Sequence, residues 1–170
     1  MYKKIVCCLV CCITFFNSYA QDTLKIAFGS CNDEKKSQEF WTSIIAQNPT
    51  HWYWLGDIVY ADTENMSELR KMYSHVKEDS NYQKLIAKTK IDGTWDDHDY
   101  GLNDGGQEFP KKEESKNELL RFLDLENNSE LTSHKGIYHS SVIKTSDMNI
   151  KTIFLDTRTF RTALQSSSIK

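Results

Sequence analysis

Three short segments that are typical of strands, each followed at once by a polar loop, constrain this chain more than any other feature. They cover residues 24–28, 52–55 and 90–94. Between the first two, residues 35–47 carry bulky apolar side chains three or four positions apart, which predicts an amphipathic helix. A strand, a helix and a strand joined by short connections form a β-α-β unit with parallel strands. The sequence therefore predicts the α/β class, a layered sheet with flanking helices.

The rest of the chain continues this pattern. Apolar residues at helical spacing predict helices over residues 64–78, 81–88 and 111–125. Two further segments, residues 136–143 and 150–155, are separated by polar turn residues and predict a β-hairpin. There is no internal repeat and no low-complexity linker, so we expect one domain.

The composition is that of a folded protein and excludes one class of partner. Of 170 residues, 39% are hydrophobic and 12% aromatic, which is enough for one core and argues against disorder. The formal net charge is −3. Because nucleic-acid-binding domains carry a basic patch, this balance disfavours direct binding of DNA or RNA.

The first twenty residues have the pattern of a secretory signal peptide. Lys3 and Lys4 precede an apolar run over residues 5–16, and residues 18–20 resemble a small-x-small cleavage site. The run is too short for a transmembrane helix. We therefore expect export to the periplasm or secretion, with the mature domain over residues 21–164.

The positions of the cysteines agree with an exported protein. Only Cys31 lies outside the leader, so we expect no internal disulfide. A lipoprotein acylated at Cys11 or Cys12 ranks second, because neither follows the usual small residue. The polar residues 165–170 are expected to form a frayed tail.

Two acidic clusters point to a metal site. The sequences GDIVY, residues 56–60, and WDDHDY, residues 95–100, each follow a predicted strand. Ligands in open α/β sheets gather outside the carboxyl ends of the strands, and crowded carboxylates there repel one another unless a cation neutralises them. Hard and borderline metals take the donors found in these segments and in the first loop: Cys31, Asp57, Tyr60, Asp97 and His98.

Structural interpretations of the same residues stay open. Taken singly, Cys31 suits a small buried side chain, Asp57 a helix N-cap, and Tyr60 a core position. The remaining acids of the second cluster are expected, with equal weight, to cap loops or to support ligands: Asp96, Asp99 and Asp104. Trp52 and Trp54 are expected in the core.

Four segments together resemble the PhoD-like alkaline phosphatases, which belong to the calcineurin-like metallophosphoesterases. They are Gly29-Ser30-Cys31, residues 56–60, the WDDHDYGLND run of residues 95–104, and Asp156-Thr157-Arg158. The WDDHDYGLND run is the most specific of these segments. The resemblance implies hydrolysis of phosphate esters by a metal-activated hydroxide.

The resemblance also implies roles for individual residues. Asp57 would bridge two metals, and Cys31 and Tyr60 would ligate Fe³⁺ at one site. Asp97 would bind the second metal, Ca²⁺. His98 would contact the phosphate and protonate the leaving oxygen. Arg158 could orient the phosphate or anchor its loop.

The sequence departs from the family in its length. Family members continue with more strands and more metal ligands, so this chain is expected to be truncated, lacking the second half of the layered sandwich. A partner chain or a missing C-terminal half would then complete the site. The alternative function is that of a catalytically inactive paralogue or an extracellular metal-binding module.

Overall fold

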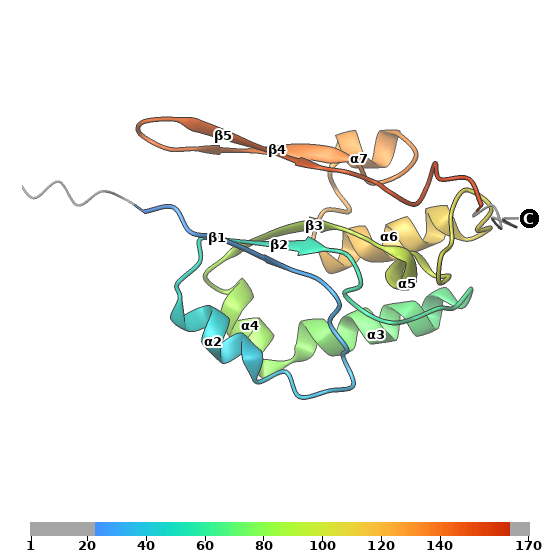
Figure 1. The fold of residues 1–170 in the computed structure, drawn as a ribbon, viewed down its shortest axis with the longest axis horizontal. Coiled ribbons are helices and arrows are strands. Elements are labelled where there is room, and N and C mark those ends of the chain that lie inside the picture. The colour runs from blue at the N-terminus through green and yellow to red at the C-terminus, as the bar shows by residue number, and fades with distance from the viewer. Residues whose placement is uncertain (1–22, 164–170) are drawn as a thin grey trace, which may run out of the picture.

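A parallel three-stranded sheet lies between a layer of helices and a β-hairpin (Figure 1). The computed structural model describes residues 23–163. The predicted signal peptide and the predicted tail over residues 165–170 lie outside the described residues. Within the described part, no helix combines the length and the apolar character needed to cross a membrane.

The sheet has the predicted parallel topology. Its strands are β1 (Ile26–Gly29), β2 (His51–Leu55) and β3 (Lys90–Thr94), in the order β1-β2-β3. Ala27 pairs with Trp52, which pairs in turn with Ile91. Because all three strands run in the same direction, their carboxyl ends meet at one edge of the sheet.

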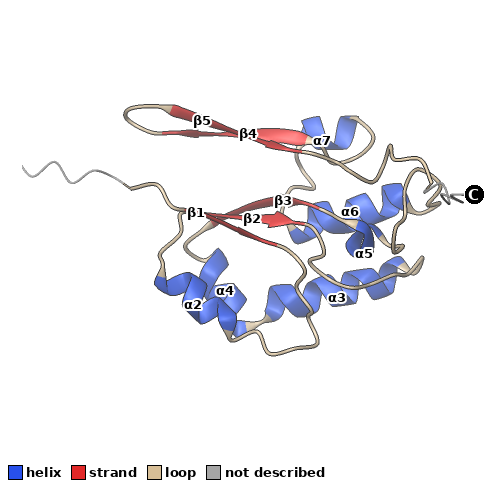
Figure 2. Cartoon of the chain, in the orientation of Figure 1, coloured by secondary structure: helices blue, strands red, loops and turns tan. Residues whose placement is uncertain are grey.

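Helices cover one face of the sheet (Figure 2). They are α2 (Phe40–Ala46), α3 (Met66–Glu78), α4 (Ser80–Ile86) and α6 (Lys112–Phe122). Alternation along β2 turns Trp52 and Trp54 towards these helices, where Trp41 packs edge-on against both at ring-centroid distances of 5.1 and 5.5 Å. The Trp54 Nε1–H group donates to the Tyr82 hydroxyl at 2.9 Å. Both strand tryptophans therefore lie in the core, as predicted.

The boundaries of the helices follow local capping. The Asn65 side chain accepts from the Ser67 N–H group at the start of α3. At the start of α4, the Asp79 side chain accepts from the N–H groups of Asn81 and Tyr82. The helix predicted from residue 35 instead begins at Phe40. The Gln38 side chain donates to the backbone carbonyls of Asp33 and Lys36, which holds this segment in turns.

Two short helices were not predicted. They are α5 (Asp97–Tyr100), directly after β3, and α7 (Ser129–Ser133), before the hairpin. Each is too short to show a helical repeat of apolar residues. Both are defined by polar caps, since Asp96 and Asp99 form a capping box at α5 and Asn128 caps α7.

The hairpin of β4 (His139–Lys144) and β5 (Asn149–Phe154) packs on the sheet face opposite the helices (Figure 1). Phe154 meets the ring of Tyr53 edge-on at 5.0 Å. The His139 Nε2 atom lies 2.8 Å from Asp92 Oδ1 on β3, and the imidazole stacks on Phe154. His139 of β4 thus connects the hairpin to the parallel sheet.

The surface around the hairpin is partly apolar. Its outward side and the sequence after it expose Val142, Ile153, Leu155 and Phe160. On the sheet itself, Phe28 and Leu55 are also exposed. The described residues therefore leave apolar area uncovered beside the parallel sheet, as expected for a partial sandwich.

The interaction between His139 and Asp92 predicts a pH-dependent stability. Burial lowers the pKa of His139, but the hydrogen bond and charge of Asp92 outweigh burial and raise the pKa above the ordinary value of 6.5. The folded protein therefore binds this proton more tightly than the unfolded chain does. The stabilisation is complete below pH 6.5 and is lost as the pH rises through the folded pKa.

We predict that His139→Gln lowers the free energy of unfolding by about 1.5–3 kcal/mol under mildly acidic conditions. The loss should shrink under alkaline conditions. Urea denaturation of both proteins at several pH values measures it. His75→Gln, at an exposed position of α3, is the control and should show little change at any pH. A loss that is equal at all pH values would contradict the assignment.

Candidate metal centre

Three loops converge where the parallel strands end. The loop after β1 is joined to the loop after β2, because the backbone N–H groups of Cys31 and Asn32 donate to the carbonyls of Gly56 and Asp57 at 3.2 and 2.8 Å. Gly56 has a φ of +103°, and a Cβ atom there would lie 2.5 Å from the Asp96 nitrogen. Only glycine allows the second and third loops to approach this closely.

Two of the carboxylates and the histidine form a compact cluster. Asp57, Asp97 and His98 each offer a ligand atom, and these atoms all lie within 4.8 Å of one another. Asp57 and Asp97 are buried, with exposed fractions of 7% and 9%. Burial and the charges of Asp96 and Asp97 raise the pKa of Asp57. Ionised carboxylates therefore repel one another here, and a bound cation would relieve that repulsion.

The Asp97 carboxylate is held by donors on its other side. Burial alone raises its pKa, but the N–H group of Asp104, at 2.8 Å, and the charge of Arg158 lower the pKa overall. These contacts favour the ionised form of Asp97, whose negative charge can attract a cation. Asp104 acts here through its backbone.

A second group of donors adjoins the first through Asp57. The Cys31 thiol donates to Asp57 Oδ2 at 3.6 Å. Burial and a side-chain hydrogen bond with Cys31 raise the pKa of Tyr60 to about 12. Asp57 therefore contacts both groups of donors: Oδ2 accepts from the Cys31 thiol, and Oδ1 accepts from the His98 N–H group at 3.4 Å. Cys31 is exposed, so the interpretation as a small buried side chain is wrong.

His98 is oriented by an acid that the sequence analysis missed. The His98 Nδ1 atom lies 2.7 Å from Asp62 Oδ2, and the Asp62 N–H group donates to the His98 carbonyl at 3.3 Å. Burial lowers the pKa of His98, but Asp62, Asp97 and Asp57 outweigh it and raise the pKa. The imidazole ring also lies against Tyr60, with 4.4 Å between ring centroids. These contacts favour an imidazolium that faces the cluster.

Arg158 binds a carboxylate of the third loop. The Nε and Nη2 atoms of Arg158 lie 2.6 and 2.5 Å from Asp96 Oδ1. The preceding Asp156 accepts from the Trp95 indole at 3.0 Å and from the N–H groups of Ile137, Arg158 and Thr159. This arrangement supports the anchoring role for Arg158 more than direct contact with a phosphate.

Two buried polar residues of the first loop lie beside Tyr60, and no sequence pattern singled them out. The Asn32 amide donates to the Ile58 carbonyl at 3.1 Å, and Glu34 Oε2 accepts from the Tyr60 N–H group at 3.4 Å. Each has one oxygen without a hydrogen-bond partner, Asn32 Oδ1 and Glu34 Oε1. They extend the connection between the first two loops.

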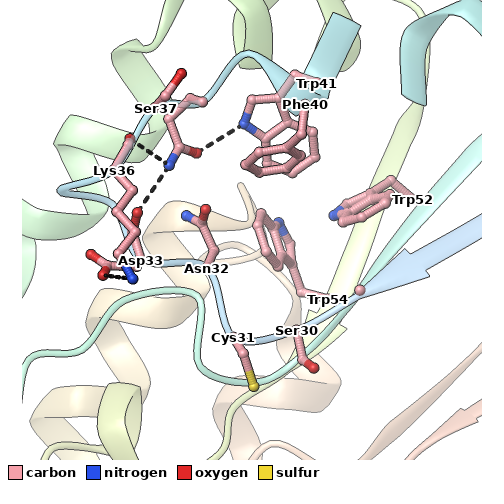
Figure 3. A pocket seen from close by; sticks show the side chains of 12 residues that line it. Ser30, Cys31, Asn32, Asp33, Lys36, Ser37, Phe40, Trp41, Trp52 and Trp54 are labelled. Atoms are coloured by element: carbon pink, nitrogen blue, oxygen red, sulfur yellow. Dashed lines mark hydrogen bonds and ion pairs between the residues drawn. The ribbon is translucent and has the colours of Figure 1, made fainter. Parts of the chain in front are cut away.

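A cavity of about 290 Å³ lies behind the first loop. Its walls include Trp41, Trp52, Trp54 and Asn32 (Figure 3). Figure 3 shows the Cys31 sulfur pointing away from these side chains. The cavity is therefore on the helix side of the loop backbone, and the thiol faces away from it.

The donor set suits metal binding. It combines carboxylates with a thiol, a phenol and an imidazole, which are the groups that iron and calcium take between them. The repulsion around Asp57 is the structural reason to expect positive charge at this point.

Comparisons with known proteins agree on the fold. No protein-family model matches this chain, and no curated protein matches it. The chain is similar to a solved structure of PhoD, with a TM-score of 0.62 and 16% sequence identity. The match covers 82% of this chain and 32% of PhoD. The predicted PhoD-like α/β fold is thus confirmed, as is its partial extent, while the low identity limits this likeness to the fold.

The anchoring role of Arg158 can be tested by a double-mutant cycle. We predict that Asp96→Asn and Arg158→Gln each lower the free energy of unfolding and that the pair shows a coupling of roughly 1 kcal/mol. Urea denaturation of the four metal-free proteins measures it. Additive losses would show that the two side chains act independently.

Proposed function

We propose that this chain is a PhoD-like, metal-dependent hydrolase of phosphate esters. One observation carries the proposal: Asp57, Asp97 and His98 bring their ligand atoms within 4.8 Å of one another at the carboxyl edge of the sheet. The likeness in fold to PhoD supports it. The sequence resemblance of residues 56–60 and 95–104 to that family adds the reaction class.

The residues around Asp57 have the donors for a two-metal centre. We assign Cys31 and Tyr60 to one cation and Asp97 to the other, with Asp57 shared, and the family resemblance suggests Fe³⁺ and Ca²⁺. When bound, such cations polarise phosphoryl oxygens and acidify water. The raised pKa of Asp57 supports this assignment, because a carboxylate that its neighbours destabilise is stabilised by a cation.

His98 has the properties of a proton donor to the leaving oxygen. Asp62 holds Nδ1 at 2.7 Å and favours the charged ring, which leaves Nε2–H free to face a phosphate. Because Asp62 fixes the ring through the opposite nitrogen, it would orient His98 without contacting the substrate. Arg158 would act indirectly by holding Asp96 and the loop that carries Asp97 and His98.

A second candidate is metal binding without turnover, as in an inactive paralogue or an extracellular module. The observation that favours it is coverage, since the chain spans only 32% of the PhoD chain. A calcium ion takes about six to eight oxygen ligands, more than the cluster itself supplies. Water, a partner chain or further polypeptide would have to provide the rest.

We also propose that the protein acts outside the cytoplasm. The proposal rests on the signal-peptide pattern of residues 1–20. Export would give the protein access to periplasmic or extracellular phosphate esters. Detection of a mature N-terminus near residue 21 in the exported fraction would support this location.

The enzyme function is tested by hydrolysis of p-nitrophenyl phosphate and bis(p-nitrophenyl) phosphate with Fe³⁺ and Ca²⁺ supplied. We predict turnover by the purified chain and a loss of at least about 100-fold in Asp57→Asn, because the shared ligand would lose its charge. Elemental analysis of the same samples should show a matching loss of bound metal.

Asp124→Asn is the matched control, since Asp124 is an exposed carboxylate beside Lys77, away from the cluster. It should leave turnover and metal content unchanged. Bound metal without turnover would favour the metal-binding module. Turnover that survives in Asp57→Asn would contradict the proposed site.

A further inference from the structure

Asp99 is the most deeply buried acid near the candidate metal centre, and it has no role in the chemistry proposed above. Its exposed fraction is 0%, and it lies inside α5 between the acids of the third loop and Tyr100. Burying a carboxylate is costly unless it is fully hydrogen-bonded. Its hydrogen bonds therefore indicate what this position does.

The two oxygens of Asp99 bind two different loops. Oδ1 accepts from the Asp96 N–H group at 2.7 Å, and Oδ2 accepts from the Ile58 N–H group at 3.0 Å. Ile58 directly follows Asp57 in sequence, and Asp96 directly precedes Asp97. One side chain thus connects the backbone beside one proposed ligand to the backbone beside the other.

A capping role alone does not account for this geometry. For the capping box of α5, the Asp99 side chain needs only to accept from the Asp96 N–H group through Oδ1. The bond to Ile58 reaches 41 positions back along the chain, to the loop after β2. Gly56 already brings the same two loops into backbone contact, because the close approach of Asp96 leaves no room for a Cβ atom on Gly56.

We propose that Asp99 is a positioning residue that sets the separation of Asp57 and Asp97 so that the two carboxylates share one cation site. The inference rests on the proposed function and deepens it. Asp99 does not touch the cation. It fixes the two backbones from which the ligands project, as supporting carboxylates do for ligands in metal sites.

Asp99→Asn separates this role from simple space filling. The side-chain oxygen of asparagine can still accept from one N–H group, but its NH₂ group is a donor and would face the other N–H group. One of the two loops therefore loses its connection while the volume of the side chain is kept. Glu118→Gln is the matched control, because Glu118 is a buried carboxylate of α6 that binds Arg70 and Arg121 away from the cluster.

The test is calorimetric titration of the full chain with Mn²⁺, a probe that carboxylate sites accept. We expect Asp99→Asn to weaken Mn²⁺ binding about 10- to 100-fold, as loss of a supporting contact does in metal sites. Glu118→Gln should bind as the wild type does, even where its thermal stability falls. Equal affinity in Asp99→Asn and wild type would overturn the inference and leave the proposed function standing. A wild type that binds no Mn²⁺ would contradict both.

If Asp99→Asn fails to fold, a second measurement on the wild type tests the inference. Amide hydrogen exchange of the metal-free wild type should show the Ile58 N–H group strongly protected, because its acceptor is a buried side chain. The exposed loop residue Asn103 gives the comparison. Exchange at Ile58 as fast as at Asn103 would overturn the inference.

Discussion

The arrangement of this molecule depends on the repulsion between buried carboxylates at one edge of a parallel sheet. Parallel strands end side by side, so the acids that follow β2 and β3 are brought together by topology rather than by sequence proximity. Asp57 and Asp97 are both buried and lie within one metal-sized cluster. Such a cluster is stable as ions only when donors and positive charge surround it. The surrounding loops supply those donors.

Every layer of the fold supports the site. On the helix side, Trp41 of α2 packs against Trp52 and Trp54 of β2 in the core beneath the strand ends. Asp99 joins the loops after β2 and β3, while Asp104 and Arg158 supply the N–H group and the charge that keep Asp97 ionised. The hairpin side contributes Asp156, which binds Trp95 at the start of the third loop. The site thus depends on residues from distant parts of the chain.

The sequence predicted the regular elements and the members of the cluster, but not the polar contacts that connect them. Apolar periodicity was sufficient to predict the parallel β-α-β unit and the hairpin. Strand-end positions were sufficient to predict that Asp57, Asp97 and His98 lie close together, while the ligand roles of Cys31 and Tyr60 stay a prediction. Apolar periodicity did not predict the short helices α5 and α7, because polar caps define them. His51 is buried and His139 is half-buried, and His139 meets Asp92 across the two layers, a contact that no sequence pattern indicated. Asp62 and Glu34 gave no signal, since their partners lie on other loops.

The central claim is that the loops after β1, β2 and β3 form a metal centre around Asp57. Anomalous X-ray diffraction from crystals of the protein grown with Mn²⁺ tests it most directly. The account predicts an anomalous peak at coordination distance from carboxylate oxygens of both Asp57 and Asp97. A well-ordered Asp57 and Asp97 with no peak between them, under conditions where Mn²⁺ is in excess, would contradict it.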